Sequence, residues 1–409
     1  MTLNTAPTAS LAAIVGHENV SSMATEGAFS VDGLAPAAIA SPGTYEEVAG
    51  VMAFASDAGL AVIPRGAGTS IQLGNVPSRY DLALSLARLT GIVEYEPADL
   101  TVTCRAGTPL TTVQDALEKH GQTLSLGPVP AGATIGGILA ANTIGRYVHS
   151  RGRPRDVTIG LRVVSADGRL TRVGGKVVKN VAGYDLGKLY IGCLGTLGVI
   201  VEATFKVTTA PATARTLTLR FEDARVACEL AAEIERRGLV AASIELVQHS
   251  DELTLAIELA GTPNAVARSE RETLELAKLR GGQPAEDQAS FETDQSPLRL
   301  RIALLPTAVP SLVAALRELE QPAALIAWPT AGLVHAGWEG ESNHLGTITE
   351  VRAQLKPEMS LVVERCSAEV KQEIDVFGEP PPSFALMRQI KQQFDPNGIL
   401  SPGRFVGRL

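Results

Sequence analysis

The first half of the chain alternates between helical and strand patterns of hydrophobic residues. Apolar residues recur on one helical face over residues 44–59, which begin with a capping box of Thr44 and Glu47. The apolar run at 60–64 predicts a buried strand that leads into a glycine-rich loop at 65–70. The same reasoning predicts strands at 82–86, 92–96, 100–105, 159–165, 170–173 and 199–207, and a helix at 108–120.

After residue 210 the pattern becomes α+β, with antiparallel strands covered by helices. The predicted strands are 216–221, 242–247, 253–259, 298–304, 323–328 and 333–338, and the predicted helices are 223–237, 265–279, 310–320 and 384–394. A polar loop is expected at 281–296. We therefore expect four regions: residues 1–30, 31–210, 211–365 and 366–409. Residues 1–30 show no sustained periodicity, which leaves partial disorder or a cap on the first domain as alternatives.

Composition narrows the class of protein. Of 409 residues, 45% are hydrophobic and 20% charged, which is typical of a globular protein. The net charge of −8 gives no general attraction to nucleic acid. The cysteines lie too far apart for a zinc or iron–sulfur motif, so no metal site is expected: Cys104, Cys193, Cys228 and Cys366. The apolar run at 11–15 is a poor secretory signal and no stretch is long enough to span a membrane, so we expect a cytoplasmic protein.

Glycine is the unusual component, with 39 residues against 9 Phe, 6 Tyr and 2 Trp. Three glycine-rich stretches, 65–70, 128–145 and 192–198, each adjoin a predicted strand. The first lacks the third glycine of the dinucleotide fingerprint, and no P-loop motif occurs. It still offers consecutive backbone N–H groups, two hydroxyls and one guanidinium, which suit a pyrophosphate. A single such loop is most simply a structural turn, whereas three together favour one anion-binding site.

Four motifs carry a resemblance to a known family. The segments 63–70, 133–137, 179–186 and 195–198 resemble the FAD-binding domain of the vanillyl-alcohol-oxidase/PCMH flavoproteins. More narrowly, Gly175–Asp185 and Phe394–Arg404 are similar to the FAD-binding accessory subunits of bacterial glycolate oxidases. The resemblance covers residues 40–210 closely and the last part of the chain.

The resemblance implies a PCMH-type domain of two α/β subdomains that hold an extended FAD, plus an α+β antiparallel substrate or cap domain. The first loop would bind the pyrophosphate, the second would pack against the ribityl chain and ring, and the third would present main-chain groups to the isoalloxazine and adenine ends. The glycines would be required because a Cβ would collide with the cofactor. The expected FAD-binding residues are Pro64, Arg65, Gly66, Ala67, Gly68, Thr69, Ser70, Ala133, Thr134, Ile135, Gly136, Gly137, Asn142, Gly195, Thr196, Leu197, Gly198, Val199 and Ile200.

This sequence departs from the family pattern at positions that affect flavin attachment and catalysis. Members with covalent flavin carry a histidine in the first loop; this loop has none, so we expect non-covalent FAD. The D-2-hydroxyacid dehydrogenases of the family that consist of one polypeptide carry a Gly-Asp-Gly-Asn-x-His segment. That segment is absent here, and Leu194 replaces a glutamate of those enzymes. Lys179 and Tyr184 are expected to be scaffold and flavin-proximal groups.

Oxidation of a hydroxy acid needs a base for the hydroxyl proton and a cation for the carboxylate. The candidate base is His335, with a packed histidine at a strand end as the alternative. Arg365 and Arg404 are candidate carboxylate ligands, with solvent-facing or partner-facing roles as alternatives.

The resemblance implies an FAD-binding subunit of a glycolate-oxidase-type complex that oxidises a short 2-hydroxy acid, such as glycolate or D-lactate, to the 2-oxo acid. A paralogous flavin subunit would carry out the substrate step, an iron–sulfur subunit would accept electrons, and membrane association would come through these partners. The alternatives are a self-sufficient FAD-dependent hydroxy-acid or polyol oxidoreductase and a non-catalytic FAD-binding scaffold.

A basic cluster follows the second glycine-rich stretch. It consists of Arg146, His149, Arg151, Arg153 and Arg155. A solvated loop, a docking surface for a partner subunit and a gate over the flavin are the alternatives for it.

Overall fold

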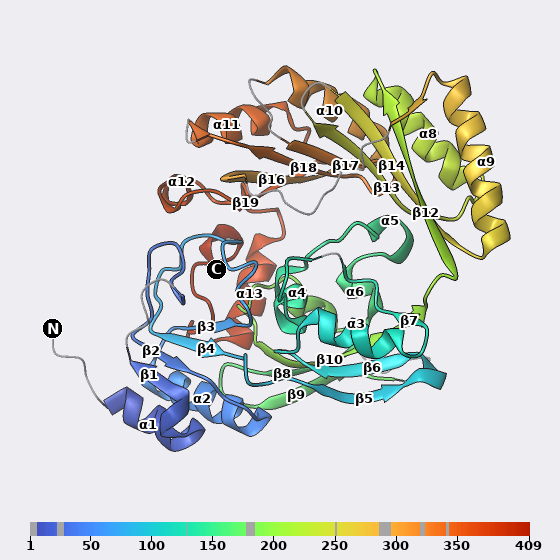
Figure 1. Ribbon diagram of the computed structural model, residues 1–409. Coiled ribbons are helices and arrows are strands. Elements are labelled where there is room, and N and C mark those ends of the chain that lie inside the picture. Colours follow the sequence, from blue (N-terminus) through green and yellow to red (C-terminus); the bar gives the residue numbers. More distant parts are fainter. Residues whose placement is uncertain are drawn as a thin grey trace. The chain divides into compact units, whose positions relative to one another are not determined.

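A computed structural model describes residues 6–22, 28–127, 129–176, 185–249, 252–285, 296–319, 324–340 and 343–409 (Figure 1). The chain forms two compact units. The first contains Met1–Thr143, Arg153–Thr209 and Lys371–Leu409, and the second contains Ile144–Gly152 and Ala210–Val370. The excursion at 144–152 belongs to the second unit, although the sequence placed it in the first domain. Pro128 and the motif residues 177–184, including Lys179 and Tyr184, lie outside the described residues.

The first sheet of the first unit has four strands in the order β1-β2-β4-β3. These are β1 (Val20–Ser22), β2 (Ala38–Ala40), β3 (Val62–Arg65) and β4 (Leu82–Ser85), and β4 is parallel to both β2 and β3. Helix α2 (Tyr45–Ala58) begins as predicted, because the Thr44 hydroxyl accepts a bond from the Glu47 N–H. Gly59 ends the helix at a φ of 65°.

Helix α1 (Ala6–Val15) was not predicted, because its sequence is rich in small residues and has no polar face. Its Leu11 and Val15 are buried, and it packs on α2. Of the two alternatives for residues 1–30, this packing favours a cap on the first domain.

The second sheet of the first unit is antiparallel, with the order β5-β6-β10-β8-β9. Its strands are β5 (Ile92–Glu96), β6 (Thr101–Arg105), β8 (Thr158–Val164), β9 (Leu170–Gly174) and β10 (Val199–Lys206). Other elements described in this unit include α3 (Leu110–Glu118), β7 (Gln122–Thr123), α4 (Ile135–Ala141), α6 (Pro154–Val157), α7 (Gly187–Tyr190), β11 (Thr208–Thr209) and α13 (Phe384–Phe394). Helix α4 lies inside the stretch that the sequence predicted as a glycine-dense loop.

The C-terminal stretch completes the first unit. The Val62 N–H donates to the Ile399 carbonyl, and the Ser401 N–H donates to the Val62 carbonyl. Residues 399–401 thus run beside β3, at the base of the first glycine loop.

The second unit is an eight-stranded antiparallel sheet with the order β15-β12-β14-β13-β17-β18-β16-β19. The strands are β12 (Thr213–Phe221), β13 (Ala241–His249), β14 (Glu252–Gly261), β15 (Gln283–Pro284), β16 (Leu298–Ala303), β17 (Ala324–Trp328), β18 (Leu333–Trp338) and β19 (Ser360–Arg365). Helices α8 (Ala224–Arg236), α9 (Pro263–Leu279), α10 (Val309–Glu318) and α11 (His344–Gln354) accompany it, and α12 (Ala368–Glu373) follows β19. Short helix α5 (Val148–Arg151) packs against β13 (Figure 1).

Among the described residues, no helix is both long enough and apolar enough to cross a membrane.

Candidate functional site

A cleft in the first unit brings the three glycine-rich stretches together. The space between its walls, including the part open to solvent, is about 800 Å³. The predicted residues that line it are Pro64, Arg65, Gly66, Gly68, Thr69, Ser70, Thr134, Gly136, Gly137, Gly195, Gly198, Val199, Ile200 and Arg404. The remaining predicted cofactor residues lie outside its lining: Ala67, Ala133, Ile135, Asn142, Thr196 and Leu197.

Several lining residues were not predicted, most of them apolar: Ile63, Ile71, Leu86, Ala106, Ala140, Ala141, Cys193 and Leu194. They come from strand β3, from the segments that follow other strands, from helix α4 and from the loops that contain the glycine motifs. Their positions beside the motifs were the available signal, but apart from the Cys193 thiol their side chains are apolar.

The first loop leaves β3 at Arg65 and offers a run of free donors. Among the described residues, the backbone N–H groups of residues 66–70 donate to no backbone carbonyl. Gly68 has a φ of 79°, a left-handed conformation that favours glycine. The Arg65 guanidinium lies over the Phe29 ring, 4.9 Å from its centroid, and burial lowers the pKa of Arg65. A loop of this kind, with donors unused and a cation beside it, fits a pyrophosphate.

Thr134 presents an unused polar atom to the same cleft. Its hydroxyl is buried and has no hydrogen-bond partner among the described residues. A Cβ on Gly66 would lie 2.0 Å from that hydroxyl oxygen, so the two chain segments meet with no room for a side chain. The unpaired Thr134 hydroxyl and the unused N–H groups of the first loop suit a polar ligand at this contact.

Packing of the protein against itself already requires two of the glycines. A Cβ on Gly136 would lie 2.8 Å from the Ala106 Cβ, and a Cβ on Gly198 would lie 2.6 Å from a Val163 methyl carbon. The sequence attributed these glycines to close approach of the cofactor. That reason is incomplete, because close approach of helix α4 and of β10 to their neighbours is sufficient.

The third loop turns inward around Cys193. Burial raises the pKa of the Cys193 thiol, and the nearby backbone N–H groups of Leu197, Gly195 and Thr196 oppose that shift. Leu194 has a left-handed φ of 54°, an unusual conformation for leucine that the surrounding structure must hold. The Thr196 N–H and hydroxyl both donate to the Cys193 carbonyl, at 3.0 Å and 2.7 Å, so the polar groups of Thr196 are used within the loop.

A cation whose side chain is only 12% exposed, Lys391, holds this loop from helix α13. The Lys391 Nζ lies 2.9 Å from the Thr196 carbonyl, 2.9 Å from the Leu400 carbonyl and 2.6 Å from an Asp395 carboxylate oxygen. Burial lowers the pKa of Lys391, and the Asp395 carboxylate opposes that shift. The sequence motif containing Asp395 was recognised, but the role of Lys391 was not.

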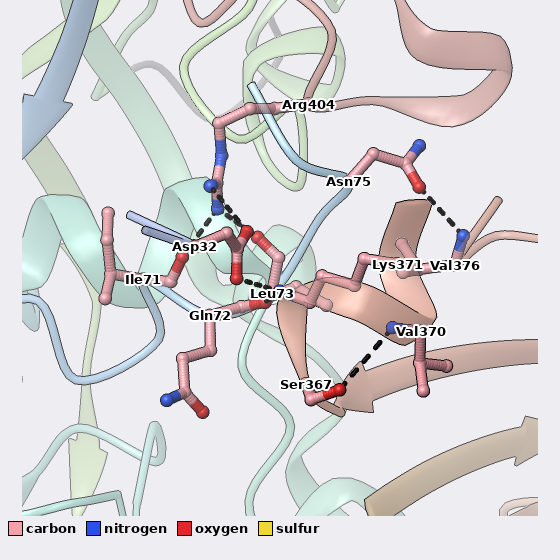
Figure 2. A network of polar contacts seen from close by, with 10 residues as sticks. All are labelled: Asp32, Ile71, Gln72, Leu73, Asn75, Ser367, Val370, Lys371, Val376 and Arg404. Atoms are coloured by element: carbon pink, nitrogen blue, oxygen red, sulfur yellow. Dashed lines mark hydrogen bonds and ion pairs between the residues drawn. The ribbon is translucent and has the colours of Figure 1, made fainter. Parts of the chain in front are cut away.

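Figure 2 shows a second buried network beside the cleft. The Arg404 guanidinium donates to the carbonyls of Ile71, at 2.6 Å, and of Leu73, and it forms an ion pair with Asp32 at 3.8 Å. Lys371, 0% exposed, also pairs with Asp32, at 2.8 Å. Burial lowers the pKa of Arg404 to about 10, although Asp32 and Tyr80 oppose the shift. Arg404 was predicted as a carboxylate ligand, but here its donors are directed to the protein.

The second unit contains the other two catalytic candidates. His335 on β18 is 5% exposed, and its Nδ1 lies 2.8 Å from the Arg299 Nη2. Because arginine only donates, Nδ1 must accept, and this bond occupies the basic lone pair. The geometry is that of a packed histidine rather than a free base. Arg365, at the end of β19, donates to the Ser296 carbonyl.

His335 belongs to a charged cluster on the sheet. Glu364 lies 3.1 Å from the Arg299 Nε and 2.7 Å from the Arg301 Nε. Burial alone would raise the pKa of Glu364, but the positive charges around it, which include Arg301 and Arg299, outweigh it and hold the pKa at about 2.

The residues of the predicted basic cluster are divided between the two units. Arg146 lies in the second unit and pairs with the buried Glu245 at 3.1 Å, whereas Arg153 and Arg155 belong to the first unit. His149 bonds to the Thr330 hydroxyl at 2.7 Å. The pairing of Arg146 removes it as a free docking charge.

Across the part of the chain that the structure describes, no group of three or more His, Cys, Asp or Glu residues could hold a metal ion.

Residues 36–174 match the model of a family described as "FAD binding domain", and residues 379–405 match "FAD linked oxidases, C-terminal domain". A D-lactate dehydrogenase from Archaeoglobus fulgidus is 30% identical over 91% of both chains. The glycolate oxidase subunit GlcD of Bacillus subtilis is 33% identical over 54% of this chain and 47% of that protein, so the match spans about half of that relative. The glycolate oxidase subunit GlcE of Escherichia coli is 45% identical over 30% of this chain and 35% of that protein.

Among solved structures, p-cresol methylhydroxylase with substrate bound has a TM-score of 0.77. It covers 98% of this chain and 96% of its own at 17% identity, a likeness that shows the fold alone.

Proposed function

Because this chain belongs to the PCMH-type family of FAD-dependent oxidoreductases, we propose that it binds FAD non-covalently in the cleft of the first unit and serves in oxidation of a short 2-hydroxy acid. The expected α+β fold, family and cofactor are confirmed. The finer proposal is the FAD-binding subunit of a glycolate-oxidase-type complex, acting on glycolate or D-lactate. We propose residues 211–365 as its substrate or cap domain.

The observation that carries the proposal is the set of unused donors in the first loop. The N–H groups of residues 66–70 would bind the pyrophosphate, with hydroxyl bonds from Thr69 and Ser70. The buried Thr134 hydroxyl supplies a further polar contact. Apolar lining residues such as Leu86 and Ile200 would exclude water from the ring.

FAD, when bound, supplies the acceptor for the hydride. The substrate hydroxyl must also lose a proton, and the described lining of the cleft contains no His, Asp or Glu. Its thiol, Cys193, has a raised pKa and is a poor base near neutral pH. This shortage supports a division of labour in which a paralogous flavin subunit carries out the substrate step and an iron–sulfur subunit accepts electrons.

A self-sufficient dehydrogenase is the second candidate. The likeness to the archaeal D-lactate dehydrogenase extends along nearly the whole of both chains, which favours it. A third, a non-catalytic FAD-binding scaffold, has the same site but no substrate step.

One experiment separates these functions. The purified chain is mixed anaerobically with glycolate or D-lactate while the flavin absorbance is followed, first alone and then with its co-expressed partner subunits. We expect bleaching only in the complex. Bleaching by the lone chain would establish the self-sufficient enzyme. If this chain's flavin does not bleach even in the complex, the non-catalytic scaffold is the function that remains. Protein from which acid releases no flavin would refute all three.

A further inference from the structure

Two cations of the C-terminal stretch, the buried Arg404 and the largely buried Lys391, hold two loops of the cleft. Lys391 donates to the Thr196 carbonyl in the loop at 192–198. Arg404 donates to the carbonyls of Ile71 and Leu73, directly after the donors of the first loop. Both contacts lie within the first unit, so one short stretch of chain fixes two walls of one site.

The two loops and the C-terminal stretch also meet directly. A Cβ on Gly195 would lie 3.3 Å from the Pro64 Cδ and 3.3 Å from the Ser401 hydroxyl oxygen. Ser401 has a left-handed φ of 43°, and its hydroxyl is buried with no hydrogen-bond partner among the described residues. A strained residue persists only where its surroundings determine it, so this junction has little freedom to adjust.

Stability alone does not explain why these two cations lie in the interior of the first unit. A buried charge loses its hydration, and a buried ion pair is often no better than an apolar pair of the same volume. Lys391 and Arg404 each have a carboxylate partner, yet each also donates to loop carbonyls, whose positions then depend on the cation. These bonds fix where the loops lie.

We propose that Lys391 and Arg404 are positioning residues for the cofactor, which set the loops at 192–198 and 66–75 in the arrangement that binds FAD. The inference rests on the proposed FAD site and replaces the predicted role of Arg404 as a carboxylate ligand. In that role, Arg404 would affect substrate binding and leave FAD affinity unchanged. As a positioning residue, it affects FAD affinity in the absence of any substrate.

The test titrates the full-length apoprotein with FAD and monitors binding by flavin fluorescence. Arg404→Lys and Lys391→Met should each weaken binding by about tenfold to a hundredfold, as expected when hydrogen bonds from a charged group are lost. Arg388→Lys and Lys119→Met change exposed residues of the same unit and should leave the dissociation constant within about twofold.

A second readout separates positioning from folding. Circular dichroism identifies a temperature at which each variant is folded, and both the affinity and the absorbance bands of bound flavin are measured there. Lys391→Arg keeps the charge and donors, so it should recover most of the affinity lost in Lys391→Met. If Lys391→Met does not fold, Arg404→Lys carries the test.

The outcomes distinguish this inference from the proposed function. Folded Arg404→Lys and Lys391→Met proteins that bind FAD as tightly as the unmodified chain, with the same flavin spectrum, would overturn the positioning role while the FAD site stands. An unmodified chain that binds no FAD would instead refute the proposed function.

Discussion

Replacing Asp32 by Asn removes the carboxylate that pairs with two buried cations, Lys371 and Arg404. At an effective dielectric constant of about 20, charges 2.8 Å and 3.8 Å apart attract by about 6 and about 4 kcal/mol before desolvation is counted. Removing one partner of a buried pair typically costs about 3–5 kcal/mol, and we expect that loss for the first unit. Asparagine tolerates the left-handed φ of 48° at this position, so the change isolates the charge.

Urea unfolding can follow the two units separately. Both tryptophans, Trp328 and Trp338, lie in the second unit, so their fluorescence reports that unit, whereas far-ultraviolet circular dichroism includes the first. With a slope of about 2–3 kcal/mol per molar urea, the first unit's midpoint should fall by about 1–2 M in Asp32→Asn. The tryptophan transition should stay in place.

The matched control is Asp167→Asn, which breaks an exposed ion pair with Arg169. Its cost should stay below about 1 kcal/mol. The double variant Asp32→Asn with Lys371→Met should lose less stability than the two single losses combined, because it leaves one fewer unpaired charge. If Asp32→Asn costs no more than the control, or if the double variant is strictly additive, the network does not act as described.

Three further predictions concern other parts of the fold. Tyr45→Phe removes a 2.7 Å hydrogen bond to the buried Glu202 and should destabilise the first unit by about 1–2 kcal/mol in urea; a loss below about 0.5 kcal/mol would contradict it. Gly66→Ala places a Cβ 2.0 Å from the Thr134 hydroxyl oxygen and should abolish flavin retention during purification, whereas Gly175→Ala, with open space around its Cβ, should retain flavin. The pKa of Glu364 is depressed from 4.5 to about 2, so its charged form stabilises the second unit above pH 4.5, and that contribution is lost as the pH falls toward 2. Glu364→Gln should flatten this dependence in tryptophan-monitored unfolding, and an unchanged pH profile would refute the assignment.

Local patterns predicted most helices and strands, because a single face of each element is buried. Helix α13 was expected at residues 384–394 and lies at Phe384–Phe394. Helix α4 was missed because its two glycines, Gly136 and Gly137, favour a loop in isolation. Packing on Ala106 overrides that preference, since only glycine fits there.

The glycine motifs were also a good guide to the cleft, but the network that holds it was not visible in the sequence. Lys371 and Asp32 lie 339 positions apart, and Arg404 and Ile71 lie 333 apart. Such pairs follow from the tertiary fold and have no local period. Arg404 was noticed as a cation, but whether its donors turn to a ligand or to a carbonyl depends on the folded backbone.

The first unit is built from three separate segments of the chain, and this sets an order of events during synthesis. The bond from Lys391 to Thr196 joins residues 195 positions apart. At translation rates of about 5–20 residues per second, the loop at 192–198 waits on the order of 10–40 s for its anchor. Until then the nascent polypeptide exposes unfinished apolar walls such as Ile71 and Leu86. The loop at 192–198 therefore gains its anchor only after residue 391 has been synthesised.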